Sequence, residues 1–141
     1  MSYAAARNEQ AREGIVRFGV VTAVDAGAAR AKVSFGGESE SAWLPWLAER
    51  AATIKVWAPV AIGEQVVVLS ESGDTAQGVI LSLVFISSYA APSGDGAEHL
   101  LQLGASSISV KDDAIIITSN GSTITIDAGG IRLDGARIDL N

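Results

Sequence analysis

Three pairs of acidic residues are the first places in this sequence where catalysis is conceivable. Hydrolysis of a glycoside needs two carboxyl groups about 5 to 10 Å apart across one cleft. All three pairs fall in turns or at outward positions of predicted short strands, where solvated acids are expected, and no pattern in the sequence predicts a cleft. We therefore expect no enzymatic site. The pairs are Asp112 with Asp113, Glu38 with Glu40, and Asp134 with Asp139.

Nucleophilic and metal chemistry is restricted by the absence of cysteine and by a single histidine, His99. Without cysteine there is no disulfide, thiolate nucleophile or thiolate metal ligand. A serine nucleophile would need His99 as its base, and no Gly-x-Ser-x-Gly turn is present. One imidazole with no second ligand nearby is typical of a solvated residue. We expect no catalytic, cofactor-binding or metal-binding residue, and no cofactor.

Three tryptophans, Trp43, Trp46 and Trp57, offer a different chemistry. Aromatic rings stack on bases and sugars, which would suit a trimeric binding module that holds a glycan or a partner protein. Large aromatic side chains also fill cores and contacts between subunits. We favour barrel or subunit contacts for all three, because aromatic residues make up only 6% of the chain and these lie beside prolines.

The charge balance excludes one class of partner. The 10 basic side chains are scattered singly among 16 acidic ones, and the net charge is −6. Nucleic-acid binding needs clustered Lys and Arg to neutralise phosphates, so we expect no nucleic-acid partner. Only 18% of the 141 residues are charged. A small globular chain usually carries about 25%, so we expect part of the surface to be covered in an assembly.

The elements that position these residues begin with an arm and a barrel. Residues 1–14 are predicted to form an N-terminal arm or short helix, with Ser2 as its cap and Gly14 as its end. Residues 15–86 read as five short strands separated by Gly and Asp turns. A closed barrel of the oligonucleotide/oligosaccharide-binding (OB) type would remove their exposed edges. Residues 87–99 are rich in Ser, Ala, Pro and Gly and are predicted to be a linker. The predicted strands are 15–25, 30–36, 40–44, 65–70 and 77–85.

Residues 100–141 contain a β-repeat. Six pairs of apolar residues, each spaced i and i+2, recur about every seven residues with Gly, Asn or Asp between them, which is typical of short strands joined by turns. The first pair is Leu101 with Leu103. Each repeat offers only two inward side chains, so one chain does not enclose a core, and we expect an intertwined triple-stranded β-helix in a homotrimer. The predicted shaft core is Ile108, Val110, Ile115, Ile117, Ile124, Ile126, Ile131, Leu133, Ile138 and Leu140.

The polar positions of the repeat have two interpretations. Asp127, Asp134 and Asp139 would bind cations on the shaft if they converged. We favour a polar exterior in which they alternate with Arg132 and Arg137 as cross-strand pairs. The fold class predicted for the whole chain is therefore all-β, with a barrel followed by a shaft.

An ordered set of motifs in the barrel carries a family resemblance. The set is Trp-Leu-Pro-Trp-Leu at 43–47, Trp-Ala-Pro at 57–59 and Gly-Glu-Gln-Val at 63–66. It resembles the phage baseplate assembly protein V family, which forms the central spike of contractile tails and tailocins. The resemblance covers about residues 14–85.

This resemblance implies a structural role without enzymatic activity. It implies a homotrimer that attaches to the tail hub and baseplate proteins and helps to puncture the outer membrane of the target cell when the sheath contracts. The expected location is the baseplate of a virion or tailocin. Members typically end in an iron-binding His-x-His tip, which this sequence lacks. Two alternatives follow: a separate tip protein caps the C-terminal end, or the tip has been lost or removed. Residues 1–14 contain no apolar run, so we expect synthesis in the host cytoplasm without a signal peptide.

Overall fold

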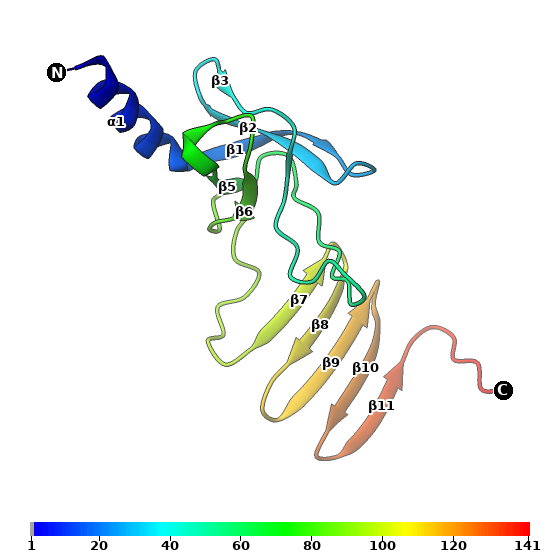
Figure 1. The fold of residues 1–141 in the computed structure, drawn as a ribbon. Coiled ribbons are helices and arrows are strands. Elements are labelled where there is room, and N and C mark those ends of the chain that lie inside the picture. The colour runs from blue at the N-terminus through cyan, green and yellow to red at the C-terminus, as the bar shows by residue number, and fades with distance from the viewer. Residues whose placement is uncertain (1) are drawn as a thin grey trace. The chain divides into compact units, whose positions relative to one another are not determined.

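A computed structural model describes residues 2–141, which form two compact units, 2–90 and 91–141. Figure 1 shows one helix and a β-barrel in the first unit and a β-sheet in the second. Within residues 2–141, no helix is both long enough and apolar enough to span a bilayer.

Helix α1 spans Tyr3–Ile15 and begins as the sequence predicts. The Ser2 side chain accepts a hydrogen bond from the Ala5 N–H at 3.2 Å and so caps the first turn. The prediction that Gly14 ends the helix is wrong by one residue. Gly14 is buried, and a Cβ atom there would lie 2.7 Å from the Gly73 carbonyl oxygen. Glycine is therefore required at position 14 for close packing rather than for termination.

The barrel closes through one bridge that lies outside the regular strands. The main sheet has the order β3-β2-β1-β5-β6, and β4 pairs with β2. Trp46, directly after β4, forms a parallel bridge with Ile80 of β6, and the Leu47 N–H donates to the Ile80 carbonyl at 2.8 Å. This bridge joins the two ends into a closed ring. The strands are β1 Val16–Asp25, β2 Arg30–Gly36, β3 Ser39–Glu40, β4 Leu44–Pro45, β5 Gln65–Leu69 and β6 Val79–Ser82, with a 3-10 turn, η1, at Glu71–Gly73.

Two predicted strands of the barrel differ from those observed. The predicted strand 40–44 is split into β3 and β4, because the Ser41 hydroxyl accepts the Val33 N–H at 2.9 Å in place of a backbone partner. The predicted strand 77–85 shortens to β6, which begins after Gly78 at φ +156. The barrel interior is filled by Val21, Ala31, Val33, Leu44, Trp46, Val66, Val68 and Ile80.

The second unit is a five-stranded antiparallel meander, in which each strand pairs with its neighbours in sequence. Strand pairing is therefore satisfied within one chain, which differs from the intertwined pairing expected from the repeat. The first strand includes His99, so placing this residue in the linker is wrong. The sixth apolar pair, Ile138 and Leu140, lies outside the strands. The strands are β7 His99–Leu103, β8 Ser106–Val110, β9 Ala114–Ser119, β10 Ser122–Asp127 and β11 Gly130–Asp134.

Candidate functional site on the C-terminal sheet

The strand register of the second unit aligns its aliphatic side chains into two columns. Turns between successive strands keep the apolar pairs opposite one another across the meander. Side chains two residues apart in a strand point to the same face, so both columns lie on one side of the sheet. One column contains Leu101, Ile108, Ile117, Ile124 and Leu133, and the other contains His99, Val110, Ile115, Ile126 and Ile131.

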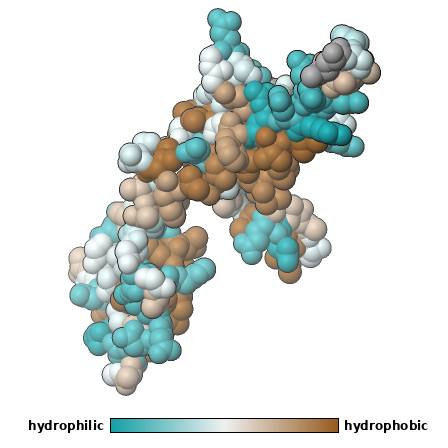
Figure 2. Space-filling model, turned by 90° about the vertical axis from the view of Figure 1, so that its left-hand side faces the viewer, coloured by the Kyte–Doolittle hydropathy of each residue, from teal (hydrophilic) through white to brown (hydrophobic). Residues whose placement is uncertain are grey.

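The aliphatic face of this sheet is more exposed to water than its other face, which is the reverse of the usual arrangement. The aliphatic members of the two columns are 37% exposed at Ile115 and up to 70% exposed at Ile131. On the other face, Ser109 is buried, and Ile116, Thr118 and Thr125 are half-buried. Antiparallel sheets normally place their apolar face on a core and their polar face in water. Figure 2 shows apolar surface gathered along one side of this unit. Gly135, Arg137 and Ile138 line one cavity together with Ile117, Ile124 and Leu133, so the C-terminal residues border one end of this surface.

The apolar strip is narrow. Beyond the two columns, Leu103 is followed across the sheet by Ser106, Ser119 and Ser122. Ser106 and Ser119 share a hydrogen bond of 2.8 Å between their hydroxyl oxygens. A polar margin therefore borders the apolar strip along one side.

Two aspartates of this unit, Asp127 and Asp139, are each paired with an arginine. The Arg132 guanidinium lies 3.0 Å from Asp127, and the Arg137 guanidinium lies 2.9 Å from Asp139. Asp134 lines a cavity of about 310 Å³ with Arg137, and no second acid lines it. Within the described residues, no group of three or more His, Asp or Glu side chains is arranged to hold a metal ion.

A short segment before β7 is fixed to the sheet by charges. Lys111 Nζ lies 3.0 Å from an Asp95 carboxylate oxygen, and the Ser109 hydroxyl donates to Glu98 at 2.5 Å. The Ala97 N–H and then Lys111 lower the pKa of Asp95, while the Ser109 hydroxyl and then Ser93 lower the pKa of Glu98. The hydrogen bond to Asp95 raises the pKa of Lys111. We call residues 93–98 the strap.

The three tryptophans have different environments in the barrel unit. Trp46 is 8% exposed and belongs to the core. The Trp57 ring packs at a tilt on Trp46, with 5.5 Å between centroids, yet Trp57 remains 62% exposed. Trp43 is 46% exposed and lies 5.3 Å below the Lys32 ammonium group. Of the three tryptophans, only Trp46 is therefore buried within one chain.

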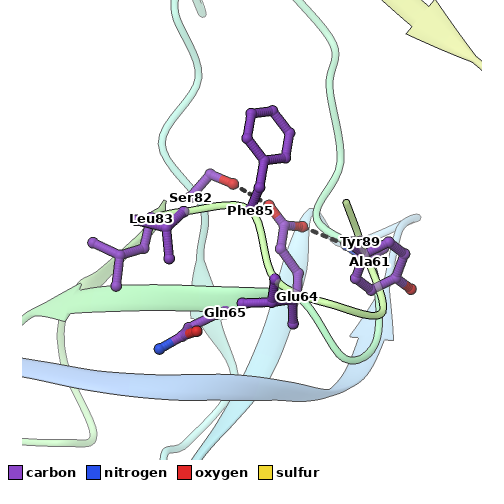
Figure 3. Close-up of a pocket in the computed structure, with 9 residues that line it drawn as sticks. Ala61, Glu64, Gln65, Ser82, Leu83, Phe85 and Tyr89 are labelled. Atoms are coloured by element: carbon purple, nitrogen blue, oxygen red, sulfur yellow. Dashed lines mark hydrogen bonds between the residues drawn. The ribbon is translucent and has the colours of Figure 1, made fainter. Parts of the chain in front are cut away.

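A cavity of about 570 Å³ lies beside β6, and sequence reasoning missed it. Glu64 lines it, and Figure 3 shows the two hydrogen bonds that its carboxylate accepts, from the Ala61 N–H at 2.9 Å and from the Ser82 hydroxyl. The rest of the lining is mostly apolar, including Leu83, Phe85 and Tyr89. No His, Lys or Arg lines the cavity to act as an acid-base partner of Glu64. Glu64 has a bridging role here, and its only signal in the sequence was the Gly-Glu-Gln-Val motif.

Comparison with known proteins identifies the barrel. Residues 17–85 match the family model of the Type VI secretion system/phage-baseplate injector OB domain. This segment belongs to the baseplate V family. The match confirms the resemblance predicted from the tryptophan and Gly-Glu-Gln-Val motifs, and it agrees with the closed barrel.

The chain is also similar to a spike protein of Escherichia phage P2. The two are 29% identical over 107 residues, more than the injector OB domain contains, so the likeness continues beyond the barrel. The matched region covers 76% of this chain and 47% of that relative, so the chain spans about half the length of the curated relative it matches.

Proposed function

We propose that this chain forms a central spike of a contractile-tail baseplate and acts as a mechanical element. The observation that carries the proposal is the apolar face of the C-terminal sheet, which one chain leaves open to water. The similarity of the chain to a phage spike protein supports the same role. The proposed location is the baseplate of a virion, tailocin or related injector.

The proposed assembly is a homotrimer whose shaft is made of three sheets around one axis. The apolar strip is two columns wide and has a serine margin. In a three-sided shaft each sheet faces only a narrow interior, whereas a two-sheet sandwich needs a broad apolar face. The narrow strip suits the three-sided shaft better. Because the meander pairs its own strands, each copy would supply one complete face. This arrangement modifies the intertwined β-helix, since burial of the columns and not exchange of strands would hold the copies together.

Stiffness would follow from this arrangement. Buckling of such a shaft would require many backbone hydrogen bonds and the buried aliphatic columns to separate together. In this proposal the barrel unit attaches to the tail hub and baseplate, and the shaft is driven through the outer membrane on sheath contraction. No step in this role requires catalysis.

The decisive experiment is the molar mass of the full chain by light scattering. One chain has a mass of 14.5 kDa, so the proposal predicts a particle of three times that mass. A monomer that stays folded would contradict the proposal, because its apolar face would then be stable in water. Antibodies against the chain should label the baseplate end of contractile tail particles from the producing cells. Labelling along the sheath would contradict the proposed location.

A further inference from the structure

The outer surface of the barrel carries a second apolar area, formed by outward side chains of β1, β5 and β6. The register of these strands arranges nine side chains in three rows of three. Eight of the nine are aliphatic or aromatic, Gln65 is the exception, and none is charged. We call this area the grid. Its rows are Val16, Leu69 and Val79; Phe18, Val67 and Leu81; and Val20, Gln65 and Leu83.

The barrel core does not account for the grid. The core uses the alternate positions of the same strands, such as Val66, Val68 and Ile80. Strands that are apolar on both faces are typical of sheets covered on both sides. In one chain the β1 side of the grid is open, with Phe18 64% exposed and Val16 51% exposed, whereas Val67 and Leu81 are half-buried. Figure 2 shows a broad apolar area on the barrel unit.

A second uncovered apolar surface lies on the long connection between β4 and β5. In residues 46–64, the exposed fraction is 71% for Ile54, 62% for Trp57, 61% for Ile62 and 59% for Leu47. A bridge between Ala51 and Lys55 holds the turn that presents Ile54. We call residues 47–62 the apolar loop. Unlike the grid, it lies outside the regular strands, and it also carries exposed charged side chains at Glu49, Arg50 and Lys55.

Symmetry links the two surfaces. This step rests on the proposed homotrimer. A closed ring of three copies needs a head-to-tail contact, in which one patch of each copy meets a different patch of the next. We infer that the grid of each barrel receives the apolar loop of the neighbouring copy, with Trp57 packed on Phe18.

The chemistry of both patches favours a second copy over a hub protein as the occupant. Stable contacts between copies are the more apolar class of interface, with charges depleted and aromatic residues enriched at the centre. The grid contains no charge, and the apolar loop supplies Trp57. Every copy has one grid and one apolar loop, so a closed ring of head-to-tail contacts leaves neither patch uncovered.

Cysteine cross-linking tests this contact, because the chain has no cysteine of its own. The full chain carrying both Phe18→Cys and Trp57→Cys is treated with the thiol oxidant diamide. Diamide takes two electrons and two protons from each pair of thiols and leaves one disulfide. The inference predicts that most of the monomer band converts to covalent dimers and trimers on a non-reducing gel. Each single variant should remain monomeric on the gel, as should Phe18→Cys combined with Ala28→Cys in the exposed β1–β2 turn.

Other outcomes of the cross-linking would overturn the inference. A ladder from Phe18→Cys alone would mean that one grid meets another grid. A particle of trimer mass with no ladder from the double variant would reject the contact and leave the spike proposal intact. A particle of monomer mass would reject both.

Fluorescence gives a second readout that does not depend on cross-linking. Phe18→Ala should shift the tryptophan emission to longer wavelength, because Trp57 would lose its cover, while the particle mass stays that of a trimer. The matched control is Tyr3→Ala, which removes an exposed aromatic residue from helix α1. Equal spectra for both variants would contradict the contact.

Discussion

Gly14 of helix α1 lies directly against the backbone of Gly73 in η1. A Cβ atom on Gly14 would come within 2.7 Å of the Gly73 carbonyl oxygen, and a Cβ atom on Gly73 would come within 2.4 Å of the Ala11 carbonyl oxygen. This backbone contact fixes the end of the helix to the barrel unit without any large side chain.

The contact between Gly14 and Gly73 predicts that Gly14→Ala destabilises the protein, whereas helix propensity predicts that it stabilises it. On propensity alone, Gly14→Ala would stabilise the protein by about 1 kcal/mol. We expect it instead to lower the free energy of unfolding by about 1 to 3 kcal/mol, because the new methyl group overpacks a backbone contact. Urea unfolding of the full chain measures this change. Gly27→Ala is the control, since its nearest neighbour is 3.6 Å away, and a loss as large as that of Gly14→Ala would contradict the explanation.

The apolar face predicts that one charge disrupts assembly. In the trimer, Ile124→Asp would bury three carboxylates around one axis, at a cost of several kcal/mol each. We expect the light-scattering mass to fall from three chains toward one. The neighbouring substitution Thr125→Asp lies on the opposite face, next to Arg132 across the strands, and should leave the mass unchanged. Loss of the trimer in both variants, or in neither, would contradict the assignment of the faces.

The strap predicts a local response to acid. The pKa values of Asp95 and Glu98 are lowered by folding, so their contribution is present above the ordinary carboxyl range and is lost as pH falls through the folded pKa values. The pKa of Lys111 is raised, so its contribution persists at neutral pH and is lost only at strongly alkaline pH. We expect the protection of the Ala97 amide from exchange, measured relative to the intrinsic exchange rate at each pH, to fall below about pH 4.

Variants separate the strap from general acid unfolding. Asp95→Asn keeps a side-chain oxygen that accepts from the Ala97 N–H but removes the ionisable group, so protection at Ala97 should persist at neutral pH and lose much of its acid dependence. Asp112→Asn, in the exposed turn after β8, should behave like the unmodified chain. Identical pH profiles for the chain and for Asp95→Asn would show that the strap does not respond to this carboxylate.

Glu64 predicts a stability effect without a catalytic one. Its carboxylate joins the Ala61 N–H before β5 to the Ser82 hydroxyl at the end of β6. Glu64→Ala leaves both donors without this partner, and we expect the free energy of unfolding to fall by about 2 kcal/mol. Glu38→Ala, in the exposed turn between β2 and β3, should change it by less than about 0.5 kcal/mol. A matching urea midpoint for Glu64→Ala and the unmodified chain would contradict the bridging role.

The barrel strands were largely predictable, because alternation and turn residues are local signals. Strand β2 begins at Arg30 and ends at Gly36, as predicted. Closure of the barrel was expected, but not the bridge from Trp46 to Ile80, since a single contact between distant residues leaves no periodic trace. The role of Gly14 was missed for the same reason, because its partner Gly73 is distant in sequence.

The repeat predicted which side chains share a face but not which strands pair. Spacing of i and i+2 places Ile115 and Ile117 together whether the neighbouring strand comes from the same chain or from another copy. The choice depends on the turns, such as Asn120-Gly121 with both residues at positive φ, which return β9 directly to β10. Ile138 satisfies the same spacing yet has no strand, since β11 ends at Asp134 and Arg137 bonds to Asp139 instead.

The meander also has a consequence for how the protein matures. Since every strand of the C-terminal unit pairs with a neighbour in sequence, its contacts are short-range, and short-range contacts form quickly. The sheet can therefore fold by successive hairpins within a newly made chain, on a timescale of about microseconds per hairpin. Meeting other copies then becomes the slow, concentration-dependent step. Spike assembly would be controlled by the supply of chains rather than by the threading of one chain around another.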